Sequence, residues 1–147
     1  MAPVTFTVTH AFTSPPDELW AALIDWDAHG EWIPATRMDI AAHGAQSVGD
    51  EFIAYTGYGP LTLVDRMRVS KIDWDATAGR GECEVEKLGP VLSGTAGFVV
   101  EPDPMGSRIE WFEDVDVKRL PKVLAAPVSA VSALGFRLAM RSLARTL

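Results

Sequence analysis

The chain has 147 residues, of which 48% are apolar, and it contains a single cysteine. This length and composition predict one compact soluble domain spanning residues 1–147, with enough apolar residues for a core. A lone cysteine excludes an internal disulfide, so we expect a reducing, cytoplasmic location.

Charge is unevenly distributed along the chain, whose net value is -7. Residues 1–116 hold all twenty acidic residues and seven basic ones, whereas residues 118–147 hold six basic residues and no acid. The acidic part would repel phosphate backbones, so we expect no nucleic acid partner. The basic end could touch an anionic membrane surface or ligand, but we expect it to be solvated instead. Its longest uncharged stretch, residues 123–136, is too short to span a bilayer, so we expect no stable membrane insertion.

The first predicted elements are a strand and two short helices. Residues 4–12 alternate between apolar and mostly threonine side chains, which predicts a strand. Ser14 and Pro15 then predict the start of a helix, with Ser14 as its N-cap and Pro15 at the first helical position. A second short helix is predicted around Asp27–Trp32 and ends before Pro34.

Six further strands are predicted after Pro34. They cover residues 36–42, 51–56, 61–73, 80–88, 92–101 and 108–117. Gly-rich and Pro-rich turns link several of them, as at residues 57–60 and 102–106. Consecutive strands with short links favour an antiparallel meander.

Alternation within these strands indicates which side chains face the core. Cys83 and Val85 oppose a row of glutamates at positions 82, 84 and 86, so the acidic row faces water. Two carboxylates interrupt apolar faces. Asp65 shares a face with residues 61, 63, 67 and 69, and Glu113 shares one with residues 109, 111, 115 and 117. Carboxylates on such faces need partners or water.

A long amphipathic helix is predicted at the end of the chain. Its C-terminal half has apolar residues at helical spacing, namely Phe136, Ala139, Met140, Leu143 and Leu147. Its N-terminal half carries small side chains, namely Ala125, Ala126, Ser129, Ala130, Ser132, Ala133 and Gly135. Such groups would leave a cavity beneath a curved sheet; alternatively, they let helix and sheet approach closely.

Several short motifs occur in the order typical of one superfamily. They are residues 14–20 at the first helix, 25–27 and 32–34 around the second, 49–52 entering a strand, 65–69 in the long strand and 111–113 in the last strand. In these motifs the chain resembles the START/SRPBCC superfamily, in its polyketide cyclase/dehydrase-like branch. The resemblance implies an α+β helix-grip fold, in which a curved seven-stranded antiparallel sheet wraps around a long C-terminal helix, with two short helices between strands 1 and 2.

This resemblance also implies a cavity for a small hydrophobic or aromatic molecule, polyketide-like or lipid-like. Trp32, Asp65, Trp111 and Glu113 match cavity positions of the family. The ligand-binding residues expected in full are Trp32, Met67, Cys83, Phe98, Trp111, Ser132 and Phe136. Residues 75–78 lack the prolines that this branch often carries, and no arginine points inward, which counts against a cyclase.

Asp65 and Glu113 are the candidate catalytic residues, with three roles open. A carboxyl group in an apolar cup favours its neutral form, so it could exchange a proton with an enolisable carbonyl near neutral pH. The same pair could instead bind a ligand hydroxyl. A third possibility is a structural role, in which the pair ties the strands to the basic helix through Lys118, Arg119 or Lys122.

Other chemistry is disfavoured by the sequence. His10, His29 and His43 lie without neighbouring ligands at metal spacing, and Cys83 is best interpreted as a small buried hydrophobe, so we expect no metal and no cofactor. Binding of a small hydrophobic molecule is the leading function. The alternatives are a polyketide cyclase or dehydratase that uses Asp65 and Glu113, and a protein-interaction module. Monomer and homodimer both stay open.

Overall fold

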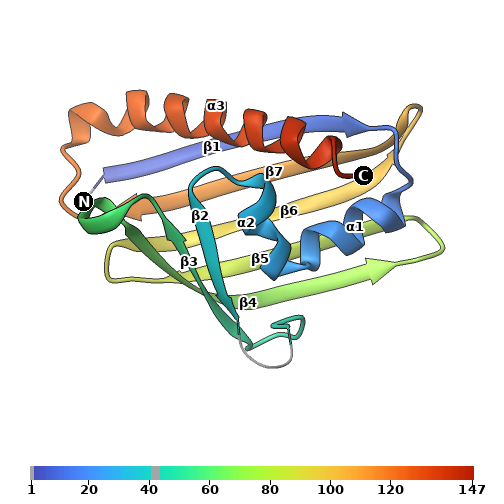
Figure 1. The fold of residues 1–147 in the computed structure, drawn as a ribbon, viewed down its shortest axis with the longest axis horizontal. Coiled ribbons are helices and arrows are strands. Elements are labelled where there is room, and N and C mark those ends of the chain that lie inside the picture. Colours follow the sequence, from blue (N-terminus) through green and yellow to red (C-terminus); the bar gives the residue numbers. More distant parts are fainter. Residues whose placement is uncertain (1, 41–43) are drawn as a thin grey trace.

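A computed structural model describes residues 2–40 and 44–147 and confirms the predicted helix-grip fold (Figure 1). Its strands form one antiparallel sheet in the order β1-β7-β6-β5-β4-β3-β2. The strands are β1 (Ala2–Phe12), β2 (Thr36–Ile40), β3 (Glu51–Thr56), β4 (Leu63–Asp75), β5 (Arg80–Leu88), β6 (Leu92–Asp103) and β7 (Gly106–Val117). The helices are α1 (Pro16–Ile24), η1 (Trp26–Ala28), α2 (His29–Trp32), η2 (Gly59–Leu61), η3 (Lys122–Leu124) and α3 (Ala125–Ala144).

The start of α1 differs from the prediction by one residue. Pro16, not Pro15, occupies the first helical position, and Ser14 does not cap the helix. The cause is the Pro-Pro pair, because a residue that precedes proline is disfavoured in the helical region, and Pro15 is indeed extended. Ser14 is buried instead, and its carbonyl oxygen accepts a hydrogen bond of 2.8 Å from Ser107 Oγ, which ties this turn to β7.

Two apolar residues expected to face the core lie outside it. Leu61 belongs to the 3-10 turn η2, which Gly59 and Pro60 begin, and it is 86% exposed. The strand therefore starts two residues later than predicted. Leu147 lies beyond the end of α3 at Ala144 and is 40% exposed. At the end of β2, residues 41 and 42 of the predicted strand lie outside the described residues, as does His43.

Alternation in the central strands is as predicted. Cys83, Val85 and Lys87 of β5 are buried on the concave face. The glutamates that alternate with them point outward. There Glu82 forms an ion pair with Lys71 of β4 at 3.1 Å, and Glu86 forms one with Arg68 of β4 at 3.9 Å. Lys87 is thus an inward cation on an otherwise apolar row, a position that matters for the site.

One end of the concave face is filled by aromatic side chains. Trp20 of α1 lies directly over Gly81 and stacks on Trp74 with 5.4 Å between ring centroids. Trp26 of η1 stacks on Phe52 at 4.5 Å. These side chains close the sheet at the α1 end, whereas the N-terminal half of α3 covers the opposite end (Figure 1). The end of the concave face under α3 is therefore the less filled one.

Helix α3 has one buried and one exposed apolar face. Ala133, Ala139, Met140 and Leu143 are buried toward the sheet. Among the described residues, the segment Lys122–Ala144 is long and apolar enough to cross a membrane by length and composition alone, a criterion that core helices of soluble proteins also meet. Only 17% of its most apolar window is buried, so much of its apolar surface faces outward.

Gly97→Ala should destabilise the protein. A Cβ at Gly97 would lie 2.2 Å from the carbonyl oxygen of Cys83 and 2.8 Å from the Phe112 ring, so the backbone of two strands would have to shift. We expect a loss of about 1–3 kcal/mol in the free energy of unfolding, measured with urea. Gly135→Ala is the matched control, because a Cβ there meets no atom within 4 Å and mid-helix alanine should stabilise by about 0.5–1 kcal/mol. Equal changes in the free energy of unfolding for the two substitutions would contradict the close backbone approach at Gly97.

Candidate functional site: a cavity between the sheet and the last helix

The concave face holds a partly open cavity with two compartments. An inner compartment of about 90 Å³ lies against β5, β6 and β7, and an outer one of about 410 Å³ lies beneath α3. The two compartments have five lining residues in common, and these mark where the compartments meet. They are Ile33, Thr56, Asp65, Glu113 and Phe136. The two candidate carboxylates therefore stand at the junction.

Most of the predicted ligand-binding residues line this cavity. Met67, Cys83, Phe98 and Trp111 line the inner compartment, Ser132 lines the outer one, and Phe136 lines both. Trp32 is buried behind this wall and packs edge-on against Trp111, with 6.2 Å between ring centroids. The linings of the two compartments do not include Trp32, whose contact with a ligand is therefore still only a prediction.

Strand register brings the charged side chains together. Lys87 of β5 pairs with Met67 of β4, and Asp65 is the next inward residue of β4. Glu113 of β7 pairs with Ala96 of β6, while Lys87 pairs with Gly94 of the same strand. The β6 residues between Lys87 and Glu113 are thus small. A lysine side chain can extend over them toward the carboxylates.

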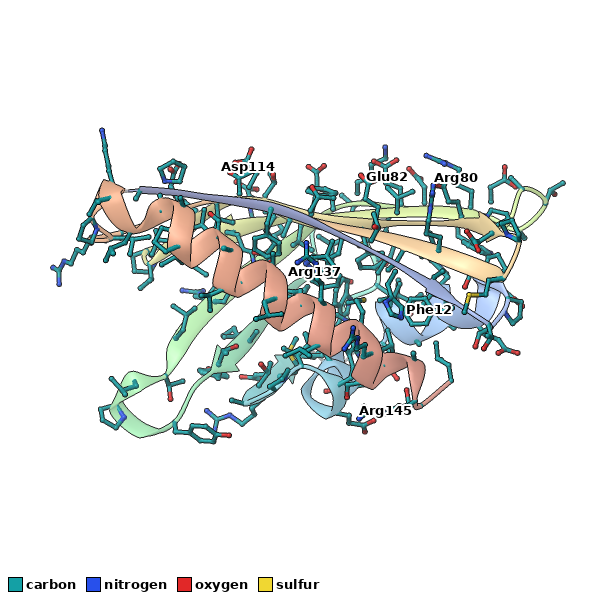
Figure 2. All side chains as sticks on the ribbon, turned by 90° about the horizontal axis from the view of Figure 1, so that it is seen from above. Phe12, Arg80, Glu82, Asp114, Arg137 and Arg145 are labelled. Atoms are coloured by element: carbon teal, nitrogen blue, oxygen red, sulfur yellow. The ribbon has the colours of Figure 1, made fainter. Side chains whose placement is uncertain are left out.

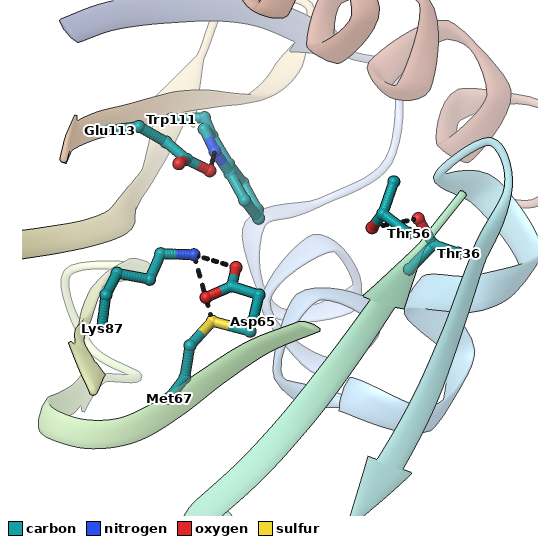
Figure 3. Close-up of polar contacts among 7 residues, drawn as sticks. All are labelled: Thr36, Thr56, Asp65, Met67, Lys87, Trp111 and Glu113. Atoms are coloured by element: carbon teal, nitrogen blue, oxygen red, sulfur yellow. Dashed lines mark hydrogen bonds and ion pairs between the residues drawn. The ribbon is translucent and has the colours of Figure 1, made fainter. Parts of the chain in front are cut away.

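Lys87 is the central polar residue of the cavity, and sequence reasoning did not assign it a role. Its Nζ donates to Asp65 Oδ2 at 2.5 Å and to Met67 Sδ at 3.3 Å (Figure 3). The Lys87 side chain is 4% exposed and that of Asp65 is 13% exposed. The signal for this position was the alternation that puts Lys87 on the same face as Cys83 and Val85.

The predicted structural partners of the carboxylates are therefore wrong. Lys118, Arg119 and Lys122 are exposed at the surface of the segment that leads into α3. The ion-pair partner of Asp65 is Lys87 instead, because the β4 and β5 register places their side chains on one concave face.

Each charge in this group alters the protonation of the others. Burial disfavours the ammonium of Lys87, but the attraction of Glu113 and Asp65 exceeds that effect and raises the pKa of Lys87 above its ordinary value. Burial is also the main reason that the pKa of Glu113 is raised, against the opposing attraction of Lys87. Lys87 therefore stays protonated, while Glu113 retains its proton to a higher pH than a solvated glutamate would.

Two buried polar atoms, one in the cavity lining and one behind it, have no hydrogen-bond partner among the described residues. They are Asp65 Oδ1 and Trp32 Nε1. An unpaired buried acceptor costs on the order of 1–3 kcal/mol, so a donor placed beside Asp65 Oδ1 would recover free energy. Glu113 Oε1 accepts only a long hydrogen bond of 3.4 Å from Trp111 Nε1. The junction therefore offers acceptors to a bound molecule.

Aromatic rings and a pair of hydroxyls form the surrounding walls. Trp111 stacks between Phe98, at 5.7 Å, and Phe136, at 4.9 Å between centroids. On the side of β2 and β3, the Thr36 and Thr56 hydroxyls lie 3.1 Å apart (Figure 3). Flat apolar walls with one polar end suit a small molecule with a ring system and a polar substituent.

Two further reactive side chains among the described residues, Cys83 and His29, are buried. Burial raises the pKa of the Cys83 thiol to about 12, so it is uncharged at neutral pH, as expected for a buried hydrophobe. His29 is buried, and its Nε2 donates to the Leu23 carbonyl oxygen at 2.7 Å. Residues 2–40 and 44–147 contain no group of three or more His, Cys, Asp or Glu that could hold a metal ion.

Comparisons with known proteins agree with this fold. A family model described as polyketide cyclase / dehydrase and lipid transport matches residues 3–147. That description supports binding of a hydrophobic ligand in general. No match is found among curated proteins.

Solved structures with the same fold have low sequence identity to this chain. Protein TTHA0849 from Thermus thermophilus is 11% identical, with a TM-score of 0.71 over 97% of this chain and 94% of that one. Protein CV1439 from Chromobacterium violaceum is 15% identical, with a TM-score of 0.66 over 96% and 95%. Ara h 8.0201 is 18% identical, with a TM-score of 0.60 over 97% and 99%. At these identities the likeness concerns the fold alone.

His29 should make the protein less stable in acid. Burial lowers its pKa from 6.5 to about 4, so the folded state favours the neutral ring. The stability that this preference gives is complete above pH 6.5 and is lost as the pH falls toward 4, by about 3 kcal/mol in all. Urea unfolding at several pH values should show that His29→Gln removes this part of the acid dependence. His10→Gln, at a half-buried site, is the control and should leave most of it in place. A wild-type acid slope retained by His29→Gln would contradict the assignment.

Proposed function

This chain belongs to the polyketide cyclase / dehydrase and lipid transport family of the START/SRPBCC superfamily, and we propose that it binds a small, neutral, hydrophobic or aromatic molecule between its sheet and α3. The molecule would carry at least one hydroxyl or similar donor. The observation that carries this proposal is the unpaired Asp65 Oδ1 at the junction of the two compartments.

Size and lining support a ligand of this kind. The outer compartment of about 410 Å³ lies within the range of small-molecule sites, and its walls include Val4, Phe6, Val115 and Val128. The inner compartment of about 90 Å³ admits only the narrow end of such a molecule. We therefore propose that an aromatic ring system fills the outer space and that its polar end lies at Asp65 and Glu113.

Charge favours a neutral ligand over a carboxylate. An anionic ligand would need the ammonium of Lys87, which Asp65 already pairs at 2.5 Å. A ligand carboxylate placed here would meet the like charge of Asp65 in a poorly solvated site, which costs free energy. A hydroxyl donates its proton to these groups without adding a charge. Lipid-like ligands would accordingly be alcohols or sterol-like molecules rather than free fatty acids.

A second candidate function is proton-transfer catalysis on such a molecule. The raised pKa of Glu113 favours this role, because a carboxyl group that titrates closer to neutrality is a better general acid or base. A protein-interaction role receives less support from the cavity, because most side chains that line its inner compartment are buried in the core.

The donor requirement can be tested with two matched probes. We expect 2-naphthol to bind more tightly than 2-methoxynaphthalene, which keeps the ring system and the oxygen but lacks the donor. Glu113→Gln should weaken 2-naphthol binding by roughly 1–3 kcal/mol and change methoxynaphthalene binding little, as measured by fluorescence titration. Glu110→Gln is the control, since Glu110 lies on the outward face of the same strand.

Other outcomes separate the remaining roles of Glu113. Unchanged affinity with turnover reduced by about 10² to 10⁴ would assign it to general acid-base catalysis. Unchanged affinity and turnover with a lower melting temperature would make it structural. Equal affinity for the two naphthalenes in the wild type would reject the donor requirement itself.

Ser132→Trp should close the outer compartment. Ser132 lines that compartment from α3, so an indole there would occupy the space of a ligand. We expect binding of the neutral naphthalene dye prodan to be abolished with only a modest loss of stability. Ala130→Trp is the matched control, because Ala130 is exposed on the same helix and should leave prodan binding intact. Outright unfolding of Ser132→Trp would mean that the space is already packed, against the cavity proposal.

A further inference from the structure

The outer face of α3 carries a stripe of exposed apolar residues that the fold does not use. The spacing along this stripe is four, three and four residues, which places its members on one side of the helix. They are Pro127, Val131, Leu134 and Leu138. Val131 is 70% exposed, Leu134 54% and Leu138 50%. In Figure 2, which looks down on α3, the helix lies in front of the other elements. Exposed apolar groups in a row point to a contact surface.

The same stripe becomes basic toward the end of the helix. Arg141 and Arg145 continue the spacing, and both are exposed. At the other end, Val123 is 82% exposed beside the exposed Lys122. Residues 118–147 contain six basic residues and no acid, although the whole chain has a net charge of -7. The face is therefore both apolar and cationic, on a protein that is otherwise acidic.

Charge argues against a second copy of this chain as the partner of this face. Two parallel α3 helices would bring Arg141 and Arg145 of one copy against the same residues of the other. Two antiparallel helices would press these arginines onto exposed valines and leave their charges without partners, which is costly. An anionic lipid surface suits both the charged and the apolar residues of this face. Its headgroups attract the arginines, and its interface accepts the apolar side chains.

We propose that the protein docks peripherally onto anionic lipid membranes through the outer face of α3, defined by Val131, Leu134, Leu138, Arg141 and Arg145. A neighbouring face of the same helix lines the outer compartment of the cavity through Val128, Ser132 and Gly135. Docking would thus place one wall of the cavity against the bilayer. The arginines stay at headgroup level, so the contact involves no stable insertion.

Vesicle sedimentation tests this proposal with phosphatidylcholine alone and with phosphatidylcholine containing phosphatidylglycerol. We expect binding to the anionic vesicles at low salt, weakening as salt rises, and little binding to the neutral ones. Leu134→Ser combined with Leu138→Ser should lower the partition coefficient about tenfold or more. Arg141→Gln combined with Arg145→Gln should lower it about 25-fold, or about fivefold for each charge lost near the surface.

Matched controls separate the docking face from general surface effects. Val48→Ser combined with Met105→Ser removes apolar groups that are 64% and 55% exposed and lie outside α3, and vesicle binding should be unchanged. Thermal melts confirm that each variant is folded. The proposal is overturned if the wild type does not sediment with anionic vesicles, or if the leucine variant binds them as the wild type does. It is also overturned if light scattering shows a dimer that the leucine variant dissociates, since a second copy would then occupy the face.

Discussion

The ion pair between Lys87 and Asp65 is the interaction on which the site depends. A lysine ammonium enclosed on a concave sheet face is stable only with close anionic partners, and removing one partner of such a pair typically costs about 3–5 kcal/mol. Asp65 supplies a direct contact at 2.5 Å and Glu113 adds attraction from β7. Three strands are therefore linked electrostatically at the middle of the sheet. The cavity cannot be wholly apolar, because these groups have to face it.

The division of the concave face into a filled and an open end follows from side-chain size. Trp20 and Trp26 occupy the end under α1 and η1, where Gly81 leaves room for an indole ring. At the other end α3 presents Ser132 and Gly135, which cannot fill the same depth. A cavity thus remains where the charged group lies. Packing at one end fixes the sheet, and this allows the other end to stay open without loss of the fold.

Much of the fold could be predicted because period-2 alternation and turn residues are local signals. The bounds of β3 and β5 agree with the prediction to the residue, and the inward placement of Asp65 and Glu113 on their strands came from the same alternation. The partner of Asp65 could not be predicted in this way. Lys87 lies 22 residues further along the chain, and its contact depends on strand register, which a single sequence does not give. The errors at Ser14 and Leu61 are of another kind, since a Pro-Pro pair and a Gly-Pro turn each displaced an element boundary.

Protonation limits the kind of chemistry that this cavity could perform. Lys87 is held as an ammonium by its carboxylate neighbours, so it is a poor nucleophile. Cys83 has a pKa of about 12 and is a neutral thiol. Covalent catalysis through either side chain is therefore disfavoured, and Glu113 is left as the group that can give or take a proton. Its raised pKa comes mainly from burial, which is greatest when the cavity holds an apolar molecule in place of water. A bound ligand would thus strengthen the condition that allows Glu113 to donate its proton, so binding and any proton transfer draw on the same dry environment.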